Sequence, residues 1–256
     1  MSQGEEGSAV TVETDGLVIK EQRIGESDKL ITVLTSRYGL IRAFVRRSAS
    51  LKSNLLSSTQ LLSYSDFVFY QGKSSYTVNA ASPKHSFFSL NENIDALSIG
   101  FYLAELFGEL APENEPAETL LRLLLNSLYL MAEKKKDPVQ VKAVAELRSL
   151  SESGYQPDLI ACATCGTFES DPMIFNPATG RLLCCEHGTA SDGMTLSISA
   201  VTAMRHIIYS EPKKIFRFTL QDDALRELSQ AAEQFALHQT GRGYKTLDFY
   251  KSLPKG

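Results

Sequence analysis

The chain has 256 residues, of which 43% are hydrophobic and 22% are charged, and its formal net charge is −4. This composition is typical of a globular protein of roughly one to three domains, and the net charge argues against a chain that is basic over its whole surface. No apolar run approaches the ~18 residues of a membrane span. Residues 1–10 are acidic and small, whereas a secretion signal is basic and then apolar. We therefore expect a cytoplasmic protein whose residues 1–12 form a flexible tail.

Residues 13–83 contain short runs rich in β-branched residues, separated by turn residues, which predicts an all-β domain. The expected strands cover 17–19, 29–35, 40–47, 66–70 and 76–78. A polar, serine-rich stretch at 48–63 separates the third strand from a hairpin that turns at Gly72. Five short strands at this spacing favour a small closed barrel of the OB-fold type.

The third expected strand alternates apolar residues with an aromatic residue between two arginines. The apolar face, expected inside the barrel, is Ile41, Ala43 and Val45. The opposite face is Arg42, Phe44 and Arg46. An exposed ring between cations suits nucleic acid, because the ring can stack on a base while the guanidinium groups contact phosphates. The pattern alone fits a solvated barrel face with one stray phenylalanine equally well.

The distribution of charge favours the nucleic-acid interpretation. Residues 16–83 contain nine basic and four acidic residues, a balance of +5 within a chain that is −4 overall. Such an asymmetry indicates a polyanionic partner. The residues predicted to contact DNA are Lys20, Arg23, Lys29, Arg37, Arg42, Phe44, Arg46, Arg47 and Lys52. Strict alternation places Arg47 on the inner face, so its inclusion assumes that the strand ends or bulges near Arg46.

Beyond residue 93 the apolar spacing becomes helical. The pattern predicts helices at about 93–110, 118–132, 137–151, 196–209, 222–238 and 245–253. The predicted fold class is therefore α+β. An N-terminal OB-fold β-barrel at 13–83 precedes an α-helical C-terminal domain at 84–256, which carries a zinc-finger-like insertion at 160–190.

This insertion holds all four cysteines of the chain. Cys162 and Cys165 form a Cys-x-x-Cys pair, and Cys184 and His187 repeat its two-residue gap after a spacer of 18 residues. Zinc takes four such ligands in a tetrahedron, and a saturated set leaves no position for water, so we predict a structural zinc ion. Clustered cysteines in a cytoplasmic chain favour a metal over disulfides.

Two details of the metal segment remain to be tested. Gly166 and Gly188 follow the two pairs, and we predict a positive φ at both, so that the turns can aim amide N–H groups at a thiolate. Cys185 is an alternative to Cys184 as the third sulfur ligand, although the second pair would then be Cys-x-His. The spacer is long enough for a small hairpin.

No catalytic motif is present. The sequence lacks a Walker phosphate loop, a Gly-x-Ser-x-Gly elbow and a His-Glu-x-x-His pair. Because the predicted metal site also has no open position, we predict that the protein is not an enzyme. Two classes remain: a DNA-binding module, and a zinc-stabilised scaffold or regulator that binds only proteins.

Motifs along nearly the whole chain resemble the RecO family of bacterial recombination mediators in DNA repair. They are Gly-Glu-Ser-Asp-Lys at 25–29, Tyr-Leu-Ala-Glu-Leu at 102–106, Glu-Leu-Arg at 146–148, Gly-Tyr-Gln-Pro at 154–157 and Cys-Ala-Thr-Cys-Gly at 162–166. The chain departs from the family pattern where His187 replaces the usual fourth cysteine and where Arg181 replaces a common glycine. Histidine is a good zinc ligand, so the site survives the first change.

The resemblance implies an OB-fold, a helical domain and a zinc-bearing part. It also implies binding of single- and double-stranded DNA, annealing of complementary strands, and loading of the recombinase RecA onto DNA coated with single-strand-binding protein. The implied partners are RecR and the acidic, apolar C-terminal tail of single-strand-binding protein, and the use of RecF stays open. That tail needs a hydrophobic pocket beside a cation, which Arg122 or Arg148 could supply. Some family members lack the metal, so zinc is not central to the shared activity.

Overall fold

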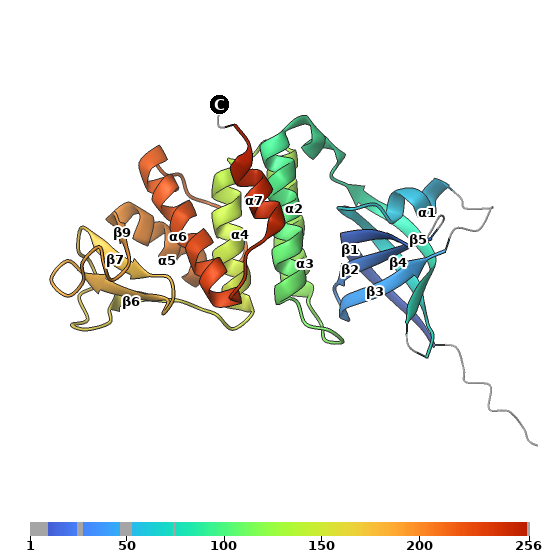
Figure 1. Ribbon diagram of the computed structural model, residues 1–256, viewed down its shortest axis with the longest axis horizontal. Coiled ribbons are helices and arrows are strands. Elements are labelled where there is room, and N and C mark those ends of the chain that lie inside the picture. The colour runs from blue at the N-terminus through green and yellow to red at the C-terminus, as the bar shows by residue number, and fades with distance from the viewer. Residues whose placement is uncertain (1–9, 25–27, 47–52, 74, 255–256) are drawn as a thin grey trace, which may run out of the picture. The chain divides into compact units, whose positions relative to one another are not determined.

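The computed structural model describes residues 10–24, 28–46, 53–73 and 75–254 (Figure 1). They form two compact units. The first comprises the chain up to Phe88 together with residues 111–125, and the second comprises residues 89–110 and those from 126 onward. The first unit is built on β-strands and the second is mainly helical, as the predicted α+β class requires.

The first unit is a closed five-stranded barrel. Its strands are β1 (Val10–Ile24), β2 (Asp28–Thr35), β3 (Gly39–Val45), β4 (Ser63–Gln71) and β5 (Tyr76–Ser86). They follow the order β1-β2-β3-β5-β4, and β1 closes the barrel by pairing with both β2 and β4. Only β3 and β5 pair in parallel among the described strands of this barrel, and a short helix, α1 (Ser53–Ser58), precedes β4. This topology confirms the predicted OB-fold (Figure 1).

Alternate strand residues fill the barrel. The buried cluster is Val12, Val18, Ile31, Val33, Ile41, Ala43, Val45, Phe67, Phe69 and Val78. The rings of Phe67 and Phe69 stack with their centroids 5.2 Å apart. The three β3 residues predicted to lie inside are all members of this cluster, so the intervening residues of β3 face outward.

Two parts of the barrel differ from the sequence prediction. The sequence predicts a first strand at 17–19, whereas β1 has 15 residues. Thr14 and Gly16 are buried positions of β1. Because neither residue is apolar and bulky, the alternation of apolar and polar residues cannot be recognised in the sequence there. The stretch at 48–63 reads only as a polar connection, yet it contains α1, whose Leu55 packs against the barrel core.

Residues 111–117 lie against the turn between β2 and β3 within the same unit. The N–H of Leu40 donates to the carbonyl of Pro112 at 2.9 Å. The N–H of Ala117 donates to the carbonyl of Ser36 at 3.0 Å. Gly39 has a φ of +60°, and a Cβ there would lie 1.9 Å from the Pro112 oxygen. Glycine is therefore required for this close approach.

The second unit contains most of the helices. They are α2 (Ile94–Leu110), α4 (Pro138–Glu152), α5 (Ile198–Tyr209), α6 (Asp222–Thr240) and α7 (Lys245–Ser252), with a 3₁₀ turn, η1 (Phe88–Glu92), before α2. Helix α3 (Glu118–Ala132) belongs to the first unit up to residue 125 and to the second from residue 126. These bounds agree closely with the predicted helices. None of the helices in the described part of the chain is long and apolar enough to cross a membrane.

Helix α4 is central to this unit, because it packs against α2, α5 and α6. Its start follows the expected signals. Asp137 caps the helix, and its Oδ1 accepts a hydrogen bond from the N–H of Val139 at 2.7 Å. Pro138 occupies the first turn, where its missing N–H costs nothing.

A small sheet lies between α4 and α5 in the sequence. Its strands are β6 (Asp158–Cys162), β7 (Met173–Asn176), β8 (Arg181–Cys184) and β9 (Met194–Leu196), in the order β6-β8-β7-β9. β7 and β8 form the hairpin predicted for the spacer, and β6 pairs in parallel with β8. Phe175 of β7 packs against Phe235 of α6, with ring centroids 5.9 Å apart, which ties the sheet to the helices.

Candidate metal centre and nucleic-acid interface

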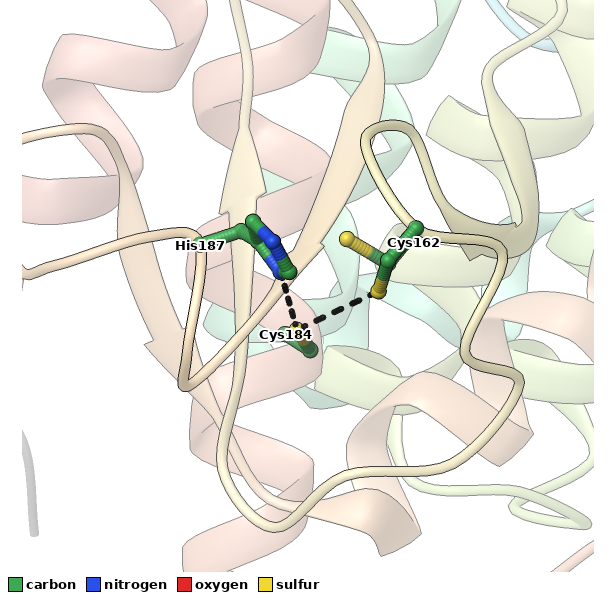
Figure 2. Close-up of side chains that lie close together, drawn as sticks. Cys162, Cys184 and His187 are labelled. Atoms are coloured by element: carbon green, nitrogen blue, oxygen red, sulfur yellow. Dashed lines mark hydrogen bonds between the residues drawn. The ribbon is translucent and has the colours of Figure 1, made fainter.

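The four predicted metal ligands converge at one end of the small sheet. Cys162 ends β6 and Cys184 ends β8, so the pairing of these strands brings the two cysteines together. Cys165 and His187 lie in the turns that follow. All four ligand atoms lie within 4.8 Å of one another. Figure 2 shows the side chains of Cys162, Cys184 and His187 pointing toward one another.

The spacing of these atoms fits a tetrahedral metal ion. Cys165 Sγ lies 3.7 Å from Cys184 Sγ, and Cys184 Sγ lies 3.2 Å from His187 Nδ1. Zinc–sulfur bonds of about 2.3 Å at tetrahedral angles separate two sulfur atoms by roughly 3.8 Å. Cys185 is exposed and lies outside the group found among the described residues, which favours Cys184 as the third sulfur. These four side chains could therefore hold a metal ion.

The backbone around Cys162 favours its thiolate. Burial raises the pKa of Cys162, but N–H groups of Cys165, Cys184 and Thr164 donate to its sulfur and lower the pKa to about 6. The thiolate is the form that binds metals. Amide groups thus stabilise a thiolate here, as predicted, although they do not come from the two glycines.

The two glycines of the metal segment have different roles. Gly166 has a φ of +75°, as predicted. The prediction of a positive φ at Gly188 is wrong. A Cβ at Gly188 would lie 2.8 Å from the Cβ of Leu183, so glycine is needed there for space. The N–H groups of the two glycines donate to the carbonyls of Cys162 and Cys184 at 2.9 and 3.0 Å and close the two turns.

On the barrel, side chains of the predicted DNA-binding set lie in rows across β1, β2 and β3. The rows are Lys20, Thr32 and Arg42, and then Gln22, Leu30 and Phe44. Lys20, Arg42 and Arg46 are exposed, and Phe44 is half-buried. The structure therefore brings two cations of the set beside one aromatic ring on one outer face, and Arg46 follows directly after β3.

Arg42 has a partner on this surface. Its guanidinium lies 3.3 Å from Glu113, and both side chains are more than half exposed. Exposed pairs of this kind contribute only about 0–1 kcal/mol, so the carboxylate is a weak competitor for the arginine. Sequence reasoning did not anticipate this contact, because it depends on residues 111–117 lying against the barrel.

Two further members of the predicted set, Lys29 and Arg23, do not lie on this outer face. The side chain of Lys29 is only 13% exposed, and its Nζ donates to Glu21 at 3.0 Å and to the carbonyl of Thr59 at 2.6 Å. The Lys29 ammonium group is therefore occupied by contacts within the barrel. Arg23 is exposed and lies opposite Lys29 in the register of β1 and β2. It is on the other face of β1 from Lys20.

Of the last three predicted residues, the structure describes one, Arg37. Arg37 is exposed in the turn between β2 and β3, at the opposite end of β3 from Arg46. Arg47 and Lys52 lie outside the described residues.

Both arginines considered for an acidic partner are already paired. Arg148 pairs with Glu152 at 2.6 Å and donates to the carbonyls of residues 207, 208 and 210 at the end of α5. Arg122 pairs with Glu118 at 2.6 Å on the exposed face of α3. Arg148 thus helps to hold α4 against the end of α5, and Arg122 is paired with a carboxylate of its own helix.

Together, these features define the class: a two-unit protein with an OB-fold barrel and a helical unit that carries a four-ligand metal cluster. The family model described as "Recombination protein O N terminal" matches residues 10–87, and "Recombination protein O C terminal" matches residues 91–248. These two matches cover nearly the whole chain, and the chain belongs to the RecO family.

Similar proteins agree with this assignment. "DNA repair protein RecO" of Acetivibrio thermocellus is 33% identical over 245 residues, which cover 95% of this chain and 98% of the relative. The protein of the same name from Alkaliphilus metalliredigens is 29% identical over 94% of this chain and 99% of the relative. That of Symbiobacterium thermophilum is 28% identical over 93% and 96% of the two chains. The family is thus one of DNA repair proteins.

Proposed function

We propose that this protein binds single- and double-stranded DNA through the outer face of β1, β2 and β3, anneals complementary strands, and helps load a recombinase onto coated DNA. The observation that carries the proposal is the placement of Arg42 and Lys20 beside Phe44 on one face of an OB-fold barrel. Cations beside a stacking ring are the usual means of binding single strands. Membership in a family of DNA repair proteins supports the same function.

The proposal extends to cofactor, partners and location. The metal is zinc, and with four protein ligands it stabilises the fold and performs no chemistry. The protein acts as a mediator without enzymatic activity. The proposed partners are RecR, the acidic tail of single-strand-binding protein and, indirectly, RecA, and the place of action is the cytoplasm at the nucleoid. The resemblance to the RecO family supports each of these partners.

We expect the double substitution Arg42→Ala and Arg46→Ala to weaken DNA binding at every sequence. Each lost phosphate contact lowers the slope of log affinity against log salt by about one unit, so the pair should lower it by about two. Fluorescence anisotropy over a salt series measures this slope. Arg226→Ala, which removes an exposed arginine of α6, is the control and should change nothing. A folded double variant with an unchanged slope would favour the protein-binding scaffold instead.

Substituting Phe44→Ala should weaken single-strand binding by about 1–3 kcal/mol if a base stacks on the ring. The salt slope should stay the same, because a ring releases no counterions. Phe67→Ala is the matched control, since Phe67 is 1% exposed and its loss should cost about 3–5 kcal/mol of stability. If Phe44→Ala lowers the melting temperature as much as Phe67→Ala does, the ring is part of the barrel core and the stacking role is wrong.

A further inference from the structure

An acidic segment of the chain lies against the barrel at the edge of the proposed DNA-binding face. Residues 111–121 contain three glutamates, Glu113, Glu115 and Glu118, and no lysine or arginine. Residues 111–125 belong to the same compact unit as the strands of the barrel. Negative charge beside a surface that is expected to bind phosphates opposes that binding. The position of this segment is therefore a feature that the proposed function does not explain.

Backbone hydrogen bonds on both sides fix the position of Glu113. The Leu40 N–H donates to the carbonyl of Pro112 at 2.9 Å. The Asn114 N–H donates to the carbonyl of Tyr38 at 3.1 Å, and Glu113 itself forms a β-bridge with the first residue of β3. Asn114 has a φ of +63°, a left-handed conformation that asparagine adopts more readily than most residues, and it turns the chain directly after Glu113. These contacts hold the segment to the barrel through its backbone, and none of them uses the Glu113 side chain.

The side chain of Glu113 reaches the guanidinium of Arg42. Its Oε1 lies 3.3 Å from Arg42 Nη2, and the two side chains are 59% and 66% exposed. Arg42 lies in one row with Lys20, beside the row that contains Phe44. A phosphate that approaches this guanidinium from solvent therefore meets a carboxylate already in contact with it. Because the two anions repel each other and share one cation, the presence of either weakens the binding of the other.

We propose that Glu113 is an affinity-determining residue of the DNA-binding face: its carboxylate occupies Arg42 in the free protein, and a DNA phosphate has to displace it. The inference rests on the proposed function, because it assumes that Arg42 contacts phosphate. An exposed ion pair contributes little to stability, so the fold does not need this contact. A lower affinity mainly means faster dissociation, and a protein that anneals strands has to release the duplex that forms. Glu113 thus favours release of DNA over its retention.

The first test is Glu113→Gln, which removes the charge and keeps the size of the side chain. The affinity for fluorescent single-stranded oligothymidine, measured by anisotropy at low salt, should rise about two- to fivefold, the value of an exposed ion pair. The gain should shrink at high salt, where exposed charges are screened. Stopped-flow displacement by unlabelled DNA should show a correspondingly slower dissociation. An unchanged affinity would overturn the proposal.

Asp66→Asn is the matched control for the change of charge. The Asp66 side chain is also 59% exposed and also pairs with a cation, Lys84, at 3.0 Å. It lies on β4, opposite Asp15 of β1, and belongs to neither row of the DNA-binding face. We expect Asp66→Asn to leave the affinity for oligothymidine near that of the wild type. A gain equal to that of Glu113→Gln would show a general effect of net charge and contradict the proposal.

The double variant Arg42→Ala plus Glu113→Gln tests whether Glu113 acts through Arg42. Without the guanidinium the carboxylate has nothing to occupy, so Glu113→Gln should add little affinity to an Arg42→Ala protein. The difference between the gains in the two backgrounds is the coupling energy of the pair in DNA binding. A full gain in the Arg42→Ala background would mean that the carboxylate repels DNA directly, and the competitor role would be wrong.

Thermal melting distinguishes this role from a purely structural one. Glu113→Gln should melt at nearly the temperature of the wild type, because the backbone bonds on both sides of residue 113 remain and an exposed pair adds little. A Glu113→Gln protein that melts at a lower temperature and binds DNA no more tightly would show that the ion pair serves to hold the segment in place. That result would also contradict the proposal.

Two outcomes separate this inference from the proposed function. If Arg42→Ala binds DNA as tightly as the wild type, Arg42 contacts no phosphate, and the proposed DNA-binding face fails together with this inference. If Arg42→Ala binds more weakly but Glu113→Gln binds no more tightly, the DNA-binding face stands and only the role of Glu113 fails. A gain in Glu113→Gln that disappears without Arg42 supports both.

Discussion

Cys184→Ser is expected to abolish stoichiometric metal binding, and the wild-type protein should carry one zinc ion per chain. Structural zinc in zinc-finger peptides binds with apparent free energies of about 10–16 kcal/mol, and three protein ligands cannot retain that affinity. The two turns, 162–167 and 184–188, should lose protection from hydrogen exchange. The hairpin of β7 and β8 should persist, because Phe175 remains packed on Phe235.

Cys185→Ser is the natural control, because it changes the neighbouring residue, which is exposed and lies outside the cluster. It should retain full metal content by elemental analysis and full protection of both turns. A Cys185→Ser protein without metal, beside a metal-bound Cys184→Ser protein, would reverse the assignment of the third sulfur. Wild-type protein purified without chelator and free of zinc would contradict the zinc prediction.

A substitution at another cysteine of the cluster, Cys165, tests whether the two units act separately. Cys165→Ser should lower stability and solubility more than DNA affinity, if the barrel is the main DNA site. Its anisotropy titration with single-stranded DNA should follow that of the wild type at equal salt. A stable, folded Cys165→Ser protein that no longer binds DNA would place the metal segment at the DNA interface.

Features that depend on local spacing could be predicted from the sequence. The apolar period located α3 and α5 closely, since a helix repeats its pattern along one face. The alternation in β3 identified Ile41, Ala43 and Val45 as interior residues, as the barrel confirms. The two-residue gaps identified the four side chains that the structure brings together.

Features that depend on contacts between distant segments could not be predicted. Glycine is required at position 188 because a Cβ there would be too close to Leu183 across a turn. The local sequence does not distinguish this lack of space from a requirement for a positive φ. Arg205 reads as an ordinary helical arginine until the loop at Phe168 lies over it. Lys142 is the clearest case, because a lysine four residues before a glutamate normally predicts an exposed helical pair.

In the structure, Lys142 is buried, with its side chain only 1% exposed. Its Nζ lies 2.9 Å from both Glu146 and Glu233. Burial lowers the pKa of Lys142, but the two carboxylates outweigh that effect and raise it, so the lysine is charged. Glu146 is fully buried, and its remaining hydrogen-bond partner is the hydroxyl of Tyr102 at 2.8 Å.

Lys142→Met should therefore lower the free energy of unfolding by about 3–5 kcal/mol, because it leaves a buried carboxylate without its cation. Glu233 keeps Lys251 at 2.7 Å, so the penalty falls mainly on Glu146. Adding Glu146→Leu removes the unpaired charge and should restore most of the stability, since apolar replacements of a buried pair are often neutral. Urea unfolding followed by circular dichroism, with hydrogen exchange of α4, measures both changes.

The pair Glu118 and Arg122 on α3 provides the matched control. It has the same four-residue spacing, but its side chains are 59% and 74% exposed. Arg122→Met should change the free energy of unfolding by less than about 1 kcal/mol, because water solvates the glutamate that remains. Burial, and not the ion pair itself, would then account for the difference between the two substitutions. Equal effects of Lys142→Met and Arg122→Met, or a double variant no more stable than Lys142→Met, would contradict this explanation.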